Sequence, residues 1–300
     1  MPLDSTALSW DLLGAFLAVM RTGSLSAASR ALGVAQPTVR RQIENLEAVL
    51  GVVLFTRSQA GLVATETAIA TLPYAESMAS AAEAFVRSVS APSDAEHGTV
   101  RVTCSEVVGF AVLPPILANL GRAHPRLQIE LSLSNANEDL LRRDADVAVR
   151  MAQPTQSALV AKRAGTVQLG VFATEAYLAE HPAPRSVADL RGHALIGKDR
   201  DPSFYAALAA AGVSLKRKDF ALRTDSDPAY LAAIRAGIGI GMCQVPLAIG
   251  PPRLRRLLPK VVAELPIWVV THEDLRGSRR VSIVFDHLVR ALTAYARSAP

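Results

Sequence analysis

Residues 22–51 read TGSLSAASRALGVAQPTVRRQIENLEAVLG, and this stretch decides the fold of the N-terminal region. Its apolar residues recur every three or four positions in two short runs, which is typical of two amphipathic helices. Ser24 stands where the first helix would begin and Gly33 where it would end. Pro37 suits the first turn of the second helix, because its missing N–H would be unpaired there. The apolar stripe of the second helix consists of Val39, Ile43, Leu46 and Leu50. Two helices joined by a tight turn predict a helix-turn-helix.

A further helix and a β-hairpin complete this unit. An apolar helical pattern over 12–20 precedes the helix-turn-helix, and Gly23 stops it. Strand candidates at 53–55 and 62–64 flank a polar turn that ends in glycine, which indicates a hairpin. We therefore predict a winged helix-turn-helix domain over residues 1–65.

The alanine-rich stretch that follows, residues 66–90, favours one long helix, which Pro73 can kink because it removes a backbone hydrogen bond. The apolar side chains that could form a seam with a second helix are Ile69, Leu72, Ala79, Ala82 and Phe85. The next residues, 90–98, have the composition of a linker. We expect a linker and dimerisation helix over 66–90 and an effector-binding domain over 91–300.

Strand and helix patterns alternate through most of residues 91–300. Alternation of this kind is typical of an α/β unit whose strands are largely parallel. About two hundred residues of α/β texture suggest two lobes with a cleft between them. The expected fold class is therefore α/β, with an N-terminal winged helix-turn-helix and a long linker helix.

Composition and charge limit the classes of protein that fit. Half of the residues are hydrophobic and a fifth are charged, which is typical of a globular chain. The net charge of +5 permits an anionic partner. Residues 1–65 hold five arginines against four acidic residues, so a DNA-binding hypothesis depends on motif geometry and not on bulk charge.

Targeting, metal and disulfide signals are weak. The sequence contains no apolar run long enough for a membrane span, and its acidic start lacks the order of a secretory signal. Two distant cysteines suggest no disulfide framework, and six histidines show no metal-ligand spacing. We expect a cytoplasmic protein without a cofactor, a metal or membrane contact.

The exposed face of the second helix is a candidate DNA-reading surface. The N-terminal part of that helix contacts base edges in a helix-turn-helix, where glutamine pairs with adenine and arginine with guanine. The residues that this hypothesis assigns to DNA are Gln36, Pro37, Thr38, Arg40, Arg41 and Arg57. Arg57 would lie along the DNA backbone or pair with a nearby acid. The alternative is that Arg40 and Arg41 belong to a solvated face.

Candidate ligand-binding positions follow the carboxyl ends of strands, where α/β sheets open. They are Thr103, Ser105, Glu106, Ser134, Asn135, Thr174, Thr224 and Gln244. At Ser105 a strand passes into a helix, and a hydroxyl with unpaired N–H groups there suits a carboxylate. We expect a small-molecule effector, with an organic anion as the favoured class. The alternative role for Ser105 is a helix cap.

Three features that could indicate an enzyme or a redox sensor lack the necessary partners. Asp144 and Asp146 form a carboxylate pair without a third catalytic group. The glycine-rich segment 237–241 lacks the Lys-Ser/Thr of a phosphate loop, and nothing near Cys104 or Cys243 favours a thiolate. We expect no catalytic site.

The N-terminal motifs closely resemble the DNA-binding domain of the LysR-type transcriptional regulators. The resemblance is carried by residues 16–19, 22–28, 31–34, 36–39, 42–43, 46–47, 50–51 and 54–55. Later motifs are similar to the landmarks of the effector domain in that family, in the same order: 113–114, 124–125, 146–148, 236–240 and 265–268. The resemblance covers nearly the whole chain.

This resemblance implies a regulator of transcription that binds double-stranded DNA and responds to a small molecule. It implies a two-lobed domain similar to periplasmic binding proteins, with hinge strands near 164–168 and 266–270. Lobe I would span about 98–164 and 268–300, and lobe II about 165–267. It also implies homodimers or homotetramers through the linker helix.

Two departures from the family pattern affect the expected DNA contacts. Ala35 stands where many relatives have serine or threonine, which would cap the helix and reach a phosphate. Arg40 stands where relatives often have a small hydroxyl residue, which suggests a different base preference. Two alternative functions are a solute-binding protein and a small-molecule enzyme, although either would leave the N-terminal motif unexplained.

Overall fold

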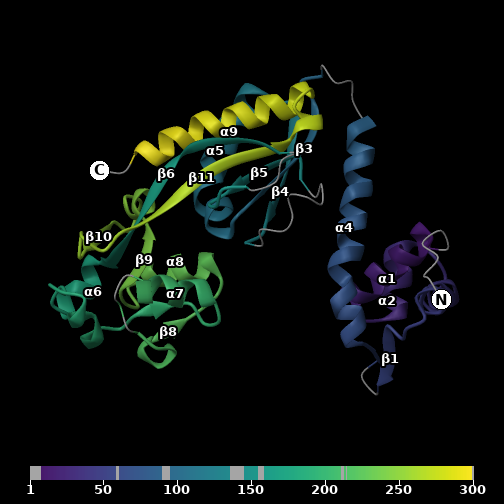
Figure 1. The fold of residues 1–300 in the computed structure, drawn as a ribbon, viewed down its shortest axis with the longest axis horizontal. Helices are drawn as coiled ribbons and strands as arrows, with labels where there is room; N and C mark the ends of the chain where they lie inside the picture. Colours follow the sequence, from purple (N-terminus) through teal and green to yellow (C-terminus); the bar gives the residue numbers. More distant parts are fainter. Residues whose placement is uncertain are drawn as a thin grey trace. The chain divides into compact units, whose positions relative to one another are not determined.

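The protein is described by a computed structural model that covers residues 8–58, 61–89, 95–135, 145–154, 159–210, 213 and 215–298. These residues fall into two compact units, one up to residue 88 and one from residue 89 onward (Figure 1). No helix within those ranges is both long and apolar enough to cross a bilayer.

Three helices and a hairpin form the N-terminal part of the first unit, as the sequence predicts. They are α1 (Trp10–Thr22), α2 (Leu25–Leu32), α3 (Gln36–Leu50), β1 (Phe55–Ser58) and β2 (Gly61–Ala64). Ser24 caps α2, since its hydroxyl accepts the N–H of Ala27 at 3.1 Å. Gly33 ends that helix with a φ of 68°, a conformation that glycine adopts without a Cβ penalty. The three helices bury one shared core, which includes Phe16, Val39 and Leu46.

The first strand of the hairpin begins later than the predicted strand at 53–55. The carboxylate of Glu47 accepts the backbone N–H groups of Leu54 at 2.7 Å and Phe55 at 3.1 Å. Pairing between the strands therefore starts at Phe55, opposite Ala64. Residues 59–60 of the predicted turn lie outside the described residues.

A single long helix, α4 (Glu66–Val89), follows the hairpin and contains Pro73. The hydroxyl of Thr65 accepts the N–H of Ala68 at 3.2 Å and so caps its first turn. Ala68 and Ala75 are buried in the core of the first unit. Large apolar side chains on the rest of the helix are exposed: Ile69, Tyr74, Met78, Phe85 and Val86.

A seven-stranded sheet forms the centre of the second unit. Its strands are β3 (Gly98–Cys104), β4 (Leu127–Leu133), β5 (Val147–Arg150), β6 (Leu159–Thr174), β9 (Gly241–Gln244), β10 (Leu254–Leu257) and β11 (Ala263–His272). The order is β10-β6-β11-β5-β3-β4, and β9 pairs with β6. Only β3 with β4 and β3 with β5 are parallel pairs, so the prediction of largely parallel strands is wrong for this sheet. The reason is that β6 and β11 run side by side in opposite directions through its middle.

Helices pack around this central sheet in both lobes, and a small two-stranded sheet lies in lobe II. They are η2 (Val108–Val112), α5 (Leu113–Ala123), α6 (Glu175–Glu180), η4 (Ala188–Gly192), α7 (Pro202–Ala210), η5 (Arg217–Asp219), α8 (Asp227–Arg235), η6 (Val245–Ala248), η7 (Glu273–Leu275) and α9 (Arg279–Arg297), with β7 (Ile196–Gly197) and β8 (Leu222–Arg223) paired in parallel. The sequence pattern around 139–142 indicates a further helix, and this segment lies outside the described residues.

The long strands β6 and β11 contain the two expected hinge segments. They pair from Ala263 opposite Leu169 to His272 opposite Leu159, with a register shift after Ile267. Figure 1 shows α9 lying along both strands. A Cβ on Gly165 would come within 2.7 Å of a carbon of α9, so the close approach of helix and strand requires glycine there.

Substitution of Glu47 tests whether its carboxylate holds the start of the hairpin against α3. Replacing it by alanine leaves the N–H groups of Leu54 and Phe55 without their acceptor, which costs about 1–3 kcal/mol per buried group left unsatisfied. We expect hydrogen exchange over residues 53–58 to accelerate in Glu47→Ala. Glu44→Ala is the matched control, because Glu44 is exposed on the same helix. Equal exchange rates in the two variants would contradict the role of Glu47.

Candidate nucleic-acid interface and ligand cleft

Helix α3 has a buried face and an exposed face. Val39, Ile43 and Leu46 are buried in the core of the first unit. The exposed side chains include five of the sequence candidates: Gln36, Pro37, Thr38, Arg40 and Arg41. Arg57 belongs to β1, opposite Leu62, but its side chain lies outside the described part of the structure. The first turn of α3 therefore presents an amide, a hydroxyl and two guanidinium groups to solvent.

Helix α3 begins without the side-chain cap that a serine or threonine at position 35 would supply. Ala35 is the N-cap residue, with extended backbone angles and no side-chain cap, and Pro37 follows in the first turn. The carbonyl of Ala35 accepts the N–H of Thr38 at 2.9 Å. An alanine cannot accept the first N–H groups through its side chain, so these groups face outward without a capping side chain.

A polar cavity of about 290 Å³ lies between the two lobes of the second unit. Four of the sequence candidates line it: Ser105, Ser134, Asn135 and Gln244. The hydroxyl oxygen of Ser105 is buried, and no residue within the described ranges gives it a hydrogen bond. A buried hydroxyl without a partner is costly, so an occupant of this cavity with a polar group would gain by bonding it.

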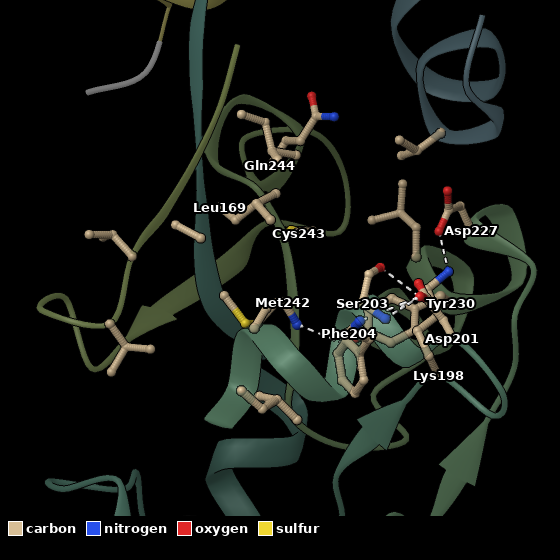
Figure 2. A pocket seen from close by; sticks show the side chains of 18 of the residues that line it. Leu169, Lys198, Asp201, Ser203, Phe204, Asp227, Tyr230, Met242, Cys243 and Gln244 are labelled. Carbon is tan, nitrogen blue, oxygen red and sulfur yellow. Dashed lines mark hydrogen bonds and ion pairs between the residues drawn. The ribbon is translucent and has the colours of Figure 1, made fainter. Parts of the chain in front are cut away.

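A larger and mostly apolar cavity, of about 370 Å³, adjoins the polar one. The two cavities share Val107, Asp227, Gln244 and Leu265 in their linings. Figure 2 shows Lys198, Asp227 and Tyr230 on one side of the larger cavity and Leu169, Cys243 and Gln244 on the other. Together they form one cleft with a polar end in lobe I and an apolar end in lobe II.

Three residues connect the lobes beside this cleft, and we call them the interlobe bridge: Glu106 and Asn135 of lobe I and Asp227 of lobe II. The carboxylate of Glu106 accepts the N–H of Asp227 at 3.0 Å, and the amide of Asn135 donates to the Asp227 carboxylate at 3.2 Å. Asn135 also accepts the N–H of Glu106 at 3.0 Å. Asp227 forms an ion pair with Lys198, whose ammonium lies 5.5 Å from the ring centre of Tyr230.

A buried arginine stands at the polar end of the cleft. Arg150 ends β5 and is 4% exposed. It donates to the carbonyl of Ser134 at 2.9 Å and to the hydroxyl of Thr103 at 3.2 Å. Thr103, which the sequence suggests as a ligand-binding residue, therefore positions Arg150. The cation lines the polar cavity and adds positive charge near Ser105.

Four of the eight sequence candidates do not line the cleft: Thr103 and Glu106 bond residues that line it, whereas Thr174 and Thr224 have other roles. The buried hydroxyl of Thr174 accepts the N–H of Tyr177 at 3.2 Å and caps α6. The hydroxyl of Thr224 accepts the N–H of Ser226 at 3.2 Å within a loop. Neither lines either cavity. For Thr174 the reason is that β6 continues past the cleft to the far edge of lobe II, where Thr174 pairs with Leu254 of β10.

Sequence reasoning missed the charged side chains of the cleft. Arg150, Lys198 and Asp227 line it, but no motif surrounds the first two. Asp227 carries one usable signal, because it precedes Pro228 in the first turn of a helix, after a serine cap. Asp146 has the structural role that the sequence favours, since its carboxylate accepts the N–H of Arg101 at 2.8 Å. Asp144 lies outside the described residues.

Both cysteines are buried free thiols, and Cys243 lines the apolar cavity. Burial raises the pKa of each thiol to about 12, although Arg150 near Cys104 and Arg235 near Cys243 oppose the shift. Thiols of this kind stay protonated and are poor nucleophiles. Over the same described ranges, no group of three histidine, cysteine or acidic side chains could hold a metal ion.

Comparisons with known proteins agree with both units. A sequence profile described as "Bacterial regulatory helix-turn-helix protein, lysR family" matches residues 10–69, and one described as "LysR substrate binding domain" matches residues 93–293. The transcriptional activator TtdR of Escherichia coli K12 is 25% identical over 95% of this chain and 94% of its own.

Solved structures share the fold. CrgA, a LysR-type transcriptional regulator from Neisseria meningitidis, is 25% identical with a TM-score of 0.58, over 95% of this chain and 99% of CrgA. CbnR, a LysR family regulator, is 22% identical with a TM-score of 0.67, over 95% of this chain and 99% of CbnR, and shows the fold alone.

A helix-turn-helix unit and a two-lobed substrate-binding domain in one chain define a transcriptional regulator with an effector-binding domain. Because both family profiles match and together cover most of its length, the chain belongs to the LysR family.

The state of the two thiols leads to a simple chemical prediction. With a pKa of about 12 against an ordinary value of 9.0, the thiolate fraction at pH 8 is lower by about a thousandfold. We expect iodoacetamide to modify Cys104 and Cys243 very slowly in the folded protein, at a rate that rises with pH throughout pH 7–10. Mass spectrometry of each cysteine, with guanidinium-unfolded protein as the control, measures this. Labelling of the folded protein at pH 8 as fast as that of the unfolded chain would contradict it.

Proposed function

We propose that this LysR-type regulator binds two half-sites of an operator as a homodimer or homotetramer, and that a small organic molecule in the cleft changes that binding. The observation that carries the proposal is that one chain presents the polar face of α3 to solvent and also contains a cleft with an unpartnered buried hydroxyl. The exposed apolar side chains of α4 support pairing between chains. Symmetric assemblies place two reading helices on half-sites separated by whole helical turns.

This function places the protein in the cytoplasm, where its DNA is, and assigns it no catalytic activity. The relative TtdR and the structural relative CrgA are described as transcriptional regulators. The protonated thiol of Cys243, which lines the cleft, also offers no activated nucleophile. A solute-binding role or an enzymatic role would leave the exposed face of α3 without a purpose.

For DNA reading, we assign base contacts to Gln36, Arg40 and Arg41 and backbone contacts to Thr38 and Arg57. Arginine can bond two acceptors of guanine at once, and glutamine can do the same with adenine. Pro37 fixes the first turn of α3 and leaves these side chains at its exposed end. Because Ala35 has no hydroxyl, the backbone N–H groups at the start of α3 would contact the phosphate in place of a side chain.

Substitution of Arg40 and Arg41 tests this assignment. Loss of a bidentate base contact costs about 1–3 kcal/mol of discrimination, whereas loss of a phosphate contact weakens binding to all sequences equally. We expect Arg40→Ala and Arg41→Ala to reduce affinity for a duplex selected by the wild-type protein more than affinity for a scrambled duplex, at matched salt. Arg191→Ala, which removes an exposed charge from the second unit, is the control. Equal losses on the two duplexes would make both arginines backbone contacts.

The cleft favours an organic anion with an apolar body. Its polar end combines the unpartnered hydroxyl of Ser105 with the guanidinium of Arg150, and a carboxylate can accept from both. Its other end is lined largely by aliphatic and aromatic side chains, including Leu169 and Phe204. The volumes of about 290 and 370 Å³ suit a small molecule. Aromatic and branched aliphatic carboxylates have this combination of groups.

The effector would act by changing how the lobes are held. A ligand shifts a conformational equilibrium only through its different affinity for the two states. Asp227 lines both cavities and also forms both bonds of the interlobe bridge, since its N–H donates to Glu106 and its carboxylate accepts from Asn135. A ligand that occupies the cleft therefore contacts the residue that joins the lobes.

The position of the effector can be tested with variants of Ser105. We expect some members of a panel of aromatic and aliphatic carboxylates to raise the melting temperature of the full-length protein as their concentration increases. Ser105→Leu should abolish this rise by filling the polar cavity, and Ser105→Ala should weaken it by removing only the hydroxyl. Thr224→Ala should leave it intact, because Thr224 does not line the cleft. An unchanged response in Ser105→Leu would exclude this site.

A further inference from the structure

A third cavity, of about 370 Å³, lies beside the edge strand β10, and three arginines border it. They are Arg253, Arg255 and Arg256, and we call this cavity the arginine hollow. In the sheet, Arg255 pairs with Ala173 of β6 and Arg256 pairs with Phe172. The lining also includes Glu175, which begins α6, and Ile249, which follows η6.

The positive charge of the hollow is only partly compensated. Among the described residues that line it, Glu175 is the single acidic one, and its carboxylate lies 3.6 Å from the guanidinium of Arg255. Both side chains of this pair are more than half exposed, so the attraction is weak and easily screened. The side chains of Arg253 and Arg256 form no hydrogen bond or ion pair with any residue inside the described ranges. Three arginines against one glutamate leave an excess of two positive charges.

Arg256 adds an observation that points to an occupant. Its Nε atom is buried and has no hydrogen-bond partner among the residues that the structure describes. A Cβ on Gly170 would lie 3.4 Å from this atom and 3.0 Å from the Phe172 ring, so the guanidinium is packed against the strand. An unsatisfied buried donor of a charged group is costly, and an anion in the hollow can supply the missing acceptor.

We propose that the arginine hollow binds a small molecule that carries a compact doubly charged anion, with a phosphate monoester as the best match. Guanidinium groups bond phosphate oxygens in pairs, and a dianion balances the excess of two positive charges. Ile249 is 54% exposed at the rim and offers an apolar contact to the carbon part of the ligand. The volume is that of a small-molecule site.

This site is separate from the effector cleft, although one short segment borders both. Gln244 lines the cleft, and the next residue, Val245, lines the arginine hollow. The proposal does not depend on the effector or on DNA binding, since it concerns only lobe II. A ligand in the hollow would be a second input to the same regulator.

Calorimetric titration of the full-length protein tests the proposal. The ligands are inorganic phosphate, glycerol 3-phosphate and malonate, each at constant ionic strength with chloride as the balancing anion. We expect saturable binding of the phosphates, weakened about tenfold or more in Arg253→Gln and in Arg256→Gln, because each loses a charge-assisted hydrogen bond. Arg253 is exposed, so its variant should fold even if that of Arg256 does not. Equal binding of malonate would extend the ligand class to dicarboxylates.

The control variants make the result specific to the hollow. Arg191→Gln removes the same charge from an exposed position of lobe II outside the hollow, and Ser105→Leu blocks the cleft. We expect both to bind phosphate as the wild-type protein does. No saturable binding in the wild type, or equal weakening in Arg191→Gln and Arg253→Gln, would overturn the proposal. If Ser105→Leu loses phosphate binding, the anion binds in the cleft, and this result would also overturn the proposal.

Discussion

The antiparallel pairing of β6 with β11 joins the two lobes of the second unit. In lobe I, β5 pairs with β11 from Trp268 to Thr271, and the lobe II strands β9 and β10 pair with the end of β6 near Phe172. The cleft lies beside these two strands, since Leu169 and Leu265 line it. Gly165 lets α9 pack closely on them. Relative movement of the lobes is therefore limited to bending or twisting of two paired strands, which is the motion typical of a hinge.

The interlobe bridge adds a second, polar connection between the lobes. The carboxylate of Asp227 accepts one bond from Asn135 of lobe I and its N–H donates one to Glu106, while Lys198 of its own lobe holds the same carboxylate. Polar contacts of this kind are weaker than the paired strands and can exchange with a ligand or water. In this account the strands fix which motions are allowed, and the bridge sets which position is favoured. A ligand in the cleft would change the favoured position of the lobes without disturbing the pairing of β6 with β11.

The sequence predicts those features that depend on neighbouring residues. The buried and exposed faces of α3 follow from one helical period, so Arg40 and Arg41 are found exposed as expected. Ser105 and Ser134 meet because they end adjacent parallel strands. Arg150 and Lys198 could not be predicted, because no local motif surrounds them and they reach the cleft only through pairing of segments far apart in the chain. The misplaced strand at 53–55 has a similar cause, since Glu47 binds two N–H groups of the following turn.

The distance between the lobes tests this account most directly. Spin labels at Ala118→Cys on α5 and Ala179→Cys on α6 occupy exposed positions of lobes I and II, and dilution with unlabelled protein restricts the measured pairs to one chain. Pulsed electron resonance then gives the distribution of interlobe distances. The account predicts a narrow distribution that shifts or broadens when Glu106→Ala and Asn135→Ala are combined, because both bonds to Asp227 are then lost. An identical distribution in the double variant would show that β6 and β11 alone hold the lobes, and would contradict the role of the bridge.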